Sequence, residues 1–365
     1  GDLYTDVLFA PDSAKRIRFD GRLKATEFFI GRLFENENRV DDISIDAEIN
    51  GLLTKDGPLV ADVHGNISKF TINKYPYQHI AIDGTISDKR FTGNLNVSDP
   101  NLMLEFDGLI DLAATPRKYD FSAHIIDADL TALGISDSDP EYHASFLIEA
   151  NAEGQSVDEL NGEIKLLNSL FSKTNSQIQV YGLELIMVNN EAHNEIKLRS
   201  DILDADISGQ YKISGLKNDI LYYLKHYVSA AIPFEFADFQ SNASKIKFDI
   251  DFKRTEPFFE FFYPDYLIGE NSRISGNFEP GNDHYLRMDG FSPFLKVRNN
   301  IWHGLVININ TEDSVLISSL GSRVFNLNKR IELENFSLEA ELQNNKMLFA
   351  SRWLNWDSTL YKGAL

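Results

Sequence analysis

The sequence predicts a mainly β protein: a long, curved antiparallel sheet that forms an open U-shaped groove, with one or two short helices. Three observations lead to this prediction. Polar and apolar residues alternate along most of the chain, glycines recur inside the alternating segments, and helical periodicity is confined to two short stretches.

The length of the chain argues against a single compact core. It has 365 residues, 43% of them hydrophobic and 25% charged, which is usual for a folded protein. One core rarely grows beyond about 250–300 residues. We therefore expect residues 1–213 to form one β-groove segment, 214–233 an amphipathic helical element, and 234–365 a continuing β-groove segment with a short helix near 256–263.

Alternation with a period of two marks strands that have one apolar face and one solvated face. Within residues 43–49 the apolar positions are Ile43, Ile45, Ala47 and Ile49. Within residues 246–252 they are Ile246, Phe248, Ile250 and Phe252. Turn signals such as Ser87-Asp88-Lys89 and Ser98-Asp99-Pro100 separate the segments, which favours short antiparallel strands added one after another.

A polar residue followed by glycine recurs within the alternating segments. Such a pair is also a two-residue hairpin signal, which would match the polarity of the residues two before and one after the glycine. Here the match is between two before and two after, as with Phe19 and Leu23 around Gly21. We therefore expect the glycines to lie inside strands on the apolar face, where they let the sheet bend. These groove-bend glycines are Gly21, Gly51, Gly65, Gly84, Gly93, Gly108, Gly162, Gly209, Gly276 and Gly290.

The apolar positions of these strands are expected to line the groove. About 25–30 strands would give an apolar face of more than roughly 2,000 Å², whereas a soluble monomer rarely exposes more than a few hundred in one patch. Such a face must pack on itself or cover a ligand. The candidate lining residues are Phe19, Leu23, Ile45, Ile49, Val63, Ile67, Ile82, Ile86, Phe91, Leu95, Phe106, Ile110, Ile164, Ile207, Phe248, Ile250, Ile274 and Phe278.

Two stretches have helical character. Residues 216–231, before Pro233, predict an amphipathic helix that packs on the core over the groove or at its end. Its apolar stripe comprises Leu216, Ile220, Leu221, Leu224, Val228 and Ala231. Residues 256–263, opened by Pro257, predict a second helix whose four phenylalanines form a hydrophobic plug or a lipid-touching element. A change of alternation phase predicts a β-bulge near Glu334–Asn335.

No catalytic or cofactor motif is present in the sequence. There is no cysteine, and the eight histidines are not at metal-ligand spacing. We therefore expect a non-enzymatic protein with no metal and no cofactor. The net charge of −20, without a cluster of Lys and Arg, excludes nucleic acid as a partner.

Three acidic groups could in principle carry chemistry. Asp137, Asp139 and Glu141 lack the glycine and distal glutamate of a calcium loop, so we expect a solvated turn. Asp127 with Asp129, and Asp204 with Asp206, are spaced two apart in predicted strands. Alternation places both pairs on the solvated face, where they serve solubility, because acid–base work by paired carboxylates requires a cleft.

Several stretches resemble the TamB family (translocation and assembly module), in the AsmA-like group of bridge-like lipid transfer proteins, with phrasing of the Bacteroidetes type. The resemblance is carried by "FDGRLKA", "IDGTISD", "FTGNLNVSDPN", "FDGLIDL", "ISGQYKISGL", "PFFEFFYPDYLI" followed by "SRISGNF", and "LENFSLEAELQNNKMLFASRWLNW". It implies an open U-shaped β structure, often called a β-taco, with a hydrophobic groove that conducts phospholipids across the periplasm for outer-membrane biogenesis.

The resemblance also implies a setting. Phospholipids are the expected cargo, and an Omp85-family outer-membrane barrel is the expected partner. The full-length protein is expected in the periplasm, attached to the inner membrane through a region outside this chain. No signal peptide is recognised and residues 4–10 already have strand character, so we expect a fragment of a longer protein.

Two functional readings follow from these patterns. A lipid conduit would hold acyl chains on its apolar face at about 0.8 kcal/mol per buried CH₂, and should co-purify with phospholipid. The alternative is a closed structural or adhesive β-solenoid, or an envelope assembly scaffold, without lipid cargo and with a filled interior.

Overall fold

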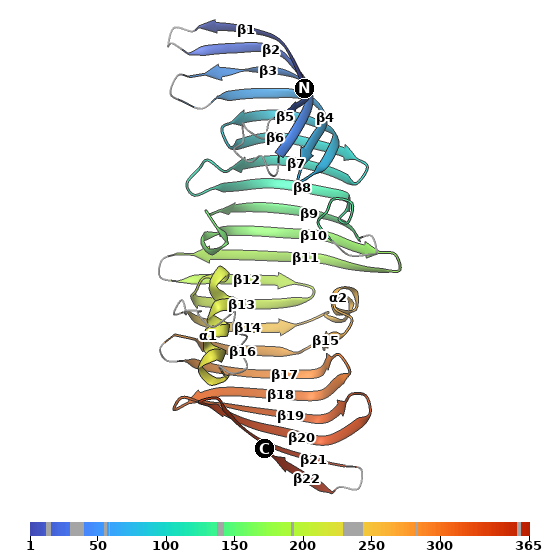
Figure 1. Cartoon of the computed structure of the whole chain (residues 1–365), viewed down its shortest axis with the longest axis vertical. Helices are drawn as coiled ribbons and strands as arrows, with labels where there is room; N and C mark the ends of the chain where they lie inside the picture. The colour runs from blue at the N-terminus through green and yellow to red at the C-terminus, as the bar shows by residue number, and fades with distance from the viewer. Residues whose placement is uncertain are drawn as a thin grey trace. The chain divides into compact units, whose positions relative to one another are not determined.

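The computed structural model describes residues 1–365 apart from 12–15, 30–39, 55–56, 58, 137–141, 191–192, 229–243, 282–283 and 356–358. It is 73% strand and contains one antiparallel sheet of 22 strands that does not close, with two α-helices (Figure 1). The mainly β class and a sheet that does not close are confirmed; the described residues form 22 strands, compared with the 25–30 expected. Within the described residues, neither helix combines the length and apolarity needed to cross a membrane.

The chain folds into two compact units. The first comprises Gly1–Gln155 and Gly162–Tyr181, and the second Ser156–Asn161 and Gly182–Leu365. One boundary between them falls within a strand, β11 (Ser176–Asn189), and the others lie on either side of the segment Ser156–Asn161.

The first unit is built from strands that pair in chain order. β1 to β9 each pair antiparallel with the next, and turns at Asp88–Lys89 and Pro100–Asn101 lie at the predicted turn signals. Its strands besides β11 are β1 (Asp2–Pro11), β2 (Ile17–Phe29), β3 (Val40–Leu53), β4 (Val60–Ile72), β5 (Tyr75–Ser87), β6 (Arg90–Asp99), β7 (Leu102–Asp111), β8 (Lys118–Asp129), β9 (Tyr142–Glu153) and β10 (Asn161–Lys173).

The pairing register aligns the apolar positions of β1–β9 in four rows on one side of the sheet. They are Phe9–Phe19–Gly51–Ala61–Ile86–Phe91–Ile110–Tyr119–Ala152, Val7–Gly21–Ile49–Val63–Gly84–Gly93–Gly108–Phe121–Ala150, Thr5–Leu23–Ala47–Gly65–Ile82–Leu95–Phe106–Ala123–Ile148 and Leu3–Ala25–Ile45–Ile67–Ile80–Val97–Leu104–Ile125–Phe146. We call these rows the first apolar face. They exist because each strand alternates with a period of two and neighbouring strands keep the same phase.

The second unit adds most of the helical residues. α1 (Leu216–Val228) follows β13, and α2 (Glu256–Phe262) follows β14. Because α2 intervenes, β14 pairs with β16 while the short β15 pairs with β17. The other elements are η1 (Val157–Glu159), β12 (Asn194–Ser200), β13 (Leu203–Gln210), η2 (Ile213–Gly215), β14 (Lys245–Phe252), β15 (Tyr266–Ile268), β16 (Arg273–Glu279), β17 (Tyr285–Val297), β18 (Asn300–Glu312), β19 (Val315–Leu327), β20 (Ile331–Gln343), β21 (Lys346–Leu354) and β22 (Leu360–Ala364).

The register of the second unit also produces continuous apolar rows. The inner two are Leu185–Leu198–Ala205–Ile250–Ile274–Gly290–Ile307–Leu320–Leu338 and Met187–Ile196–Ile207–Phe248–Gly276–Met288–Ile309–Ser318–Ala340. We call these two rows the second apolar face.

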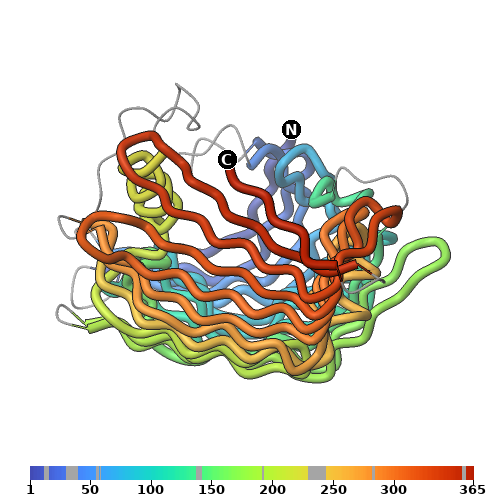
Figure 2. Tube along the Cα trace, turned by 90° about the horizontal axis from the view of Figure 1, so that it is seen from below, coloured from blue at the N-terminus to red at the C-terminus, as the bar shows by residue number. Residues whose placement is uncertain are grey.

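The strands of the second unit are bent (Figure 2), and the pairing ladder of β17–β20 is interrupted within the strands. Pairing skips Pro293, Gly304, Arg323 and Asn335 on successive strands. Pro293 has no N–H to donate, and a register shift between Glu334 and Ser337 confirms the predicted bulge. Next to these interruptions, buried serines donate hydrogen bonds to backbone carbonyls. The Ser292 hydroxyl donates to the Phe294 carbonyl at 2.7 Å, and the Ser322 hydroxyl donates to the Val324 carbonyl at 2.8 Å.

All ten predicted glycines lie inside strands, so the hairpin interpretation is excluded. Gly209 has a φ of +138°, and a Cβ there would overlap the carbonyl oxygen of Lys245 on the neighbouring strand. Close backbone approach therefore explains this glycine. Gly290 differs, because the nearest atom to a Cβ would be 3.7 Å away. Its role as a close-approach glycine is not supported.

The predicted stripe of α1 is partly wrong. Its buried residues are Asp219, Tyr223 and Tyr227, whereas Ile220 is 50% exposed. Tyr227 donates its hydroxyl to the His284 carbonyl at 2.9 Å, so an aromatic side chain with a polar tip fills the contact that the stripe assigned to aliphatic residues. Ala231 and Pro233 lie outside the described residues.

α1 packs on the sheet, as predicted for the amphipathic helix. Tyr223 and Tyr227 form a buried cluster with Leu316, against which Phe278 and Leu342 also pack. In Figure 1 the helix crosses strands of the second unit near one margin of the sheet. The helix thus covers one side of the apolar surface of this unit.

The second predicted helix is confirmed as α2, with Pro257 in its first turn. Phe261 is buried, while Phe258 contacts Phe262 with ring centroids 5.0 Å apart. Phe262 and Tyr263 are exposed. The helix therefore anchors through Phe261 and presents part of its aromatic cluster to solvent.

Candidate functional site

The predicted lining residues fall into two sets, one in each unit. The twelve from Phe19 to Ile110 all lie on the four rows of the first apolar face, and Ile164 lies in β10 of the same unit. In the second unit Ile207, Phe248, Ile250 and Ile274 lie on the second apolar face. Phe278 lies in the adjacent row, next to α1.

The centre of the first apolar face is buried by its own side chains. Val63, Ile67 and Ile82 belong to one cluster with Ala47 and are each 7% exposed or less. The described residues of this unit contain no helix and no second sheet layer, so neighbouring rows do the burying. Ile86, near the end of β5, is 38% exposed.

The second apolar face is more open. Ile207, Phe248, Ile250 and Ile274 are only partly buried, although they occupy the middle of their strands. The packing contacts of α1 are mainly with the adjacent row, at Phe278, Leu316 and Leu342, and its cluster includes only Ile309 of the two inner rows. In the described residues, large apolar side chains in the middle of this unit therefore retain accessible surface.

The sequence prediction missed several members of the second face. They are Met187, Ile196, Leu198, Met288, Ile307, Ile309, Leu320 and Leu338. The signal that could have found them is the same period-two alternation, which continues through β11, β12 and β17–β20.

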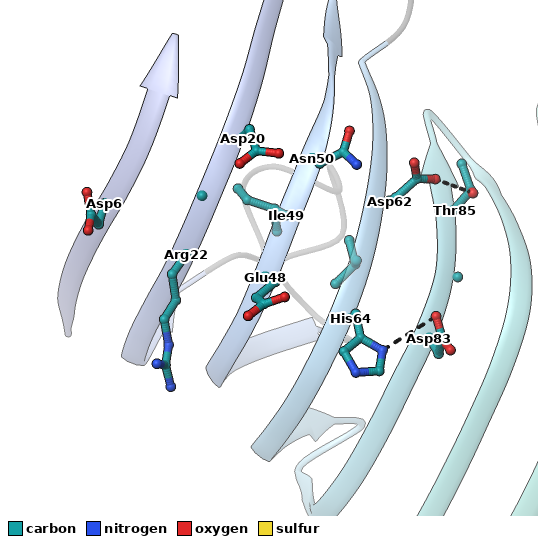
Figure 3. A pocket seen from close by; sticks show the side chains of 13 residues that line it. Asp6, Asp20, Arg22, Glu48, Ile49, Asn50, Asp62, His64, Asp83 and Thr85 are labelled. Atoms are coloured by element: carbon teal, nitrogen blue, oxygen red, sulfur yellow. Dashed lines mark hydrogen bonds and ion pairs between the residues drawn. The ribbon is translucent and has the colours of Figure 1, made fainter.

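The opposite side of the first unit is polar and carries a hollow of about 640 Å³ (Figure 3). Its carboxylates come from five strands: Asp6, Asp20, Glu48, Asp62 and Asp83. His64 lies 3.6 Å from Asp83, and the Thr85 hydroxyl donates to Asp62 at 2.6 Å. Among the described residues no group of three side chains could hold a metal ion.

Cross-strand ion pairs also lie on the polar side. Arg22 donates to Asp46 at 2.6 Å, and this hydrogen bond lowers the pKa of the Asp46 carboxyl. Both side chains are substantially exposed, so the pair contributes little to stability.

The paired aspartates have structural partners. Asp206 accepts two hydrogen bonds from Arg199, at 2.7 and 3.0 Å, and Asp204 accepts one from Lys253 at 2.6 Å.

Asp127 lies 3.2 Å from His143, on the solvated face as predicted. Asp129 differs from the prediction, because its carboxylate accepts the N–H groups of Thr131 and Ala132 and stabilises a turn. Asp137, Asp139 and Glu141 lie outside the described residues.

A polar pocket of about 900 Å³ lies at one margin of the second unit. We call it the margin pocket; it is lined by Ser156, Asp158, Glu159, Asn161, Asn189, Asn190, His193, Asn194, Gln210, Tyr211 and Lys212. The side-chain Oδ1 of Asn161 accepts the backbone N–H of Asn189 at 2.6 Å, and the side-chain amide of Asn194 donates to the Tyr211 backbone carbonyl at 2.7 Å. Sequence reasoning missed it, because its three segments are far apart in the chain.

Charges of both signs surround this pocket. Burial raises the pKa of Asp158, but hydrogen bonds from the Ser214 hydroxyl and N–H and the charge of Lys212 together lower it below its ordinary value. Asp158 is therefore ionised at neutral pH. Burial and the nearby Glu195 raise the pKa of Tyr211 to about 12, so Tyr211 remains a neutral hydroxyl.

Comparison with known proteins gives no relative for this chain: no family model, no curated protein and no solved structure matches it.

Proposed function

We propose that the chain is a non-enzymatic phospholipid carrier, whose apolar faces hold acyl chains in an open groove. One observation carries the proposal: in each unit the pairing register aligns the apolar positions of successive strands in rows, filled mostly by apolar side chains and glycine. In the second unit Ile207, Phe248, Ile250 and Ile274 keep accessible surface although they lie in mid-strand.

The chemistry of the rows suits acyl chains. Each buried CH₂ contributes about 0.8 kcal/mol without requiring a directional contact. Rows of Ile, Leu and Phe therefore hold chains of different length and saturation, and they allow a chain to move from one position to the next.

The proposed setting follows from the resemblance to the TamB family. In that setting the protein carries phospholipids across the periplasm for outer-membrane biogenesis, attached to the inner membrane through another region, with an Omp85-family barrel as partner. An envelope scaffold or closed solenoid without cargo is the competing proposal, and lipid capture separates the two.

A matched pair of substitutions in β13 tests the proposal. Ile207 lies on the second apolar face, and its neighbour Ser208 lies on the opposite side of the sheet. Ile207→Glu should lower the phospholipid captured from vesicles severalfold, because a carboxylate on the acyl-chain path must be desolvated. Ser208→Glu adds the same charge on the solvated side and should leave capture unchanged. Equal capture by both variants and the parent, measured by mass spectrometry of extracted lipid, would contradict the proposal.

A further inference from the structure

We propose that the margin pocket binds a phospholipid headgroup that carries both a phosphate and an ammonium group, as in phosphatidylethanolamine. The inference rests on the proposed function, because the acyl chains of the same molecule would extend over the second apolar face.

The pocket directly adjoins that face. Asn189 pairs with Asn194, and Asn194 pairs with Gly209, in a row next to Met187, Ile196 and Ile207. Asn194 and Ile196 are two residues apart on β12, which corresponds to roughly 7 Å along the strand. A glycerol backbone can bridge this step, with the headgroup among the amides and the chains on the apolar rows.

The row that contains these amides changes character along the sheet. Beyond Gly209 it continues as Ile246 and Phe278, and in β19 and β20 it consists of Leu316 and Leu342. Tyr223 and Tyr227 of α1 cover it there. The row is thus apolar where the helix packs on it and amide-bearing at the margin pocket, which indicates a change of ligand chemistry along the margin.

The charges in the pocket match a zwitterion. Lys212 supplies a cation for a phosphate, and side-chain amides such as those of Asn190 and Gln210 supply N–H donors. Glu159 supplies a carboxylate for an ammonium group, while Asp158 is held by the Ser214 hydroxyl and N–H. A headgroup with phosphate alone would bring no cation to Glu159. The volume of about 900 Å³ lies within the range of small-molecule sites.

The test is a competition between two headgroups. The whole chain is incubated with vesicles of equimolar phosphatidylethanolamine and phosphatidylglycerol, and the captured lipid is quantified by mass spectrometry. The parent chain should enrich phosphatidylethanolamine. Glu159→Lys should shift the ratio about fivefold toward phosphatidylglycerol, as one charge contact of a headgroup is worth up to about this factor. Lys212→Gln should lower capture of both lipids by about two- to fivefold.

Glu332→Lys is the matched control, because Glu332 is an exposed carboxylate of β20 in the same unit and does not line the pocket. It should leave the headgroup ratio unchanged. If Glu159→Lys retains lipid capture with an unaltered ratio, the headgroup site is overturned while the proposed function stands. If the parent chain captures no phospholipid, the proposed function fails, and the headgroup site fails with it.

Discussion

At the scale of single residues, the fold depends on where a Cβ fits. Strands approach each other so closely at Gly209 that a side chain would overlap the carbonyl oxygen of Lys245, and its φ of +138° is rarely adopted by other residues. Gly290 also follows a polar residue, but an added Cβ there would make only ordinary contacts, the nearest at 3.7 Å. Both positions have a polar residue followed by glycine, so this motif identifies strand glycines without revealing which of them are irreplaceable.

Alanine substitutions distinguish these two glycines. Gly209→Ala should destabilise the second unit by about 1–3 kcal/mol, because it imposes backbone strain and displaces β14. Gly290→Ala should be neutral or stabilising by up to about 1 kcal/mol, because it only restricts the unfolded chain. Urea unfolding followed by tyrosine and tryptophan fluorescence measures both. Equal unfolding midpoints for the two variants would show that the close backbone approach at Gly209 does not make a side chain there destabilising.

The lowered pKa of Asp158 predicts how the stability of the folded protein depends on pH. Its pKa in the folded protein is lowered below the ordinary value of 3.8, so its contribution to stability is fully present above that value. The contribution is lost as the pH falls through the lower, folded-state pKa. The stability difference between the parent chain and Asp158→Asn should therefore be constant near neutral pH and shrink below about pH 4. A difference that grew on acidification would contradict the assigned hydrogen bonds from Ser214.

At the scale of elements, α1 shows what periodicity could and could not predict. The stripe through Leu216, Leu224 and Val228 correctly indicated an amphipathic helix packed on the sheet. Its exact buried face, with Asp219, Tyr223 and Tyr227, was missed. Tyrosine ranks as intermediate in burial, and here each hydroxyl finds a partner: Thr311 at 3.0 Å for Tyr223, and the His284 carbonyl for Tyr227. Such partners come from distant strands and leave no local signal.

Substitutions on the two sides of α1 test this assignment. Tyr227→Ala removes a fully buried aromatic and should cost about 3–5 kcal/mol, with faster amide exchange throughout the helix. Ile220→Ala, at a half-exposed position of the same helix, should change stability by less than about 1 kcal/mol. Hydrogen exchange monitored by mass spectrometry measures the protection of the helix amides in both variants. A greater loss of protection from amide exchange in Ile220→Ala than in Tyr227→Ala would contradict this assignment and favour the buried stripe that the sequence predicts.

The strands themselves were the most predictable part of the fold. A period of two fixes which side chains share a face, so all four rows of the first apolar face follow once neighbouring strands pair in chain order. The margin pocket was not predictable, because it assembles residues from three distant segments, such as Asp158, Asn194 and Lys212, at strand ends and connections, which have no periodicity. Ser292 and Ser322 were missed for a related reason. Their hydroxyls donate to the carbonyls of Phe294 and Val324, next to positions where the strand pairing is interrupted, and the sequence does not show these interruptions.

At the scale of the whole chain, each of the two units has a sheet with two chemically distinct sides. One side carries cross-strand ion pairs, such as Arg22 with Asp46 in the first unit and Arg273 with Asp249 in the second. The other side carries apolar rows that are packed together in the first unit and more open in the second. A protein that only needed a stable core would gain by covering these rows, which is why we assign them to an acyl-chain ligand.

Photo-crosslinking along one strand tests this assignment most directly. A photoreactive amino acid is placed in turn at residues 246–251 of β14, and crosslinked phospholipid is measured after incubation with vesicles. Positions 246, 248 and 250 face the apolar side, and 247, 249 and 251 face the polar side. We expect crosslinks at alternate positions, strongest at 248 and 250. Crosslinks at every position alike, or at none, would contradict the claim that the apolar rows hold lipid.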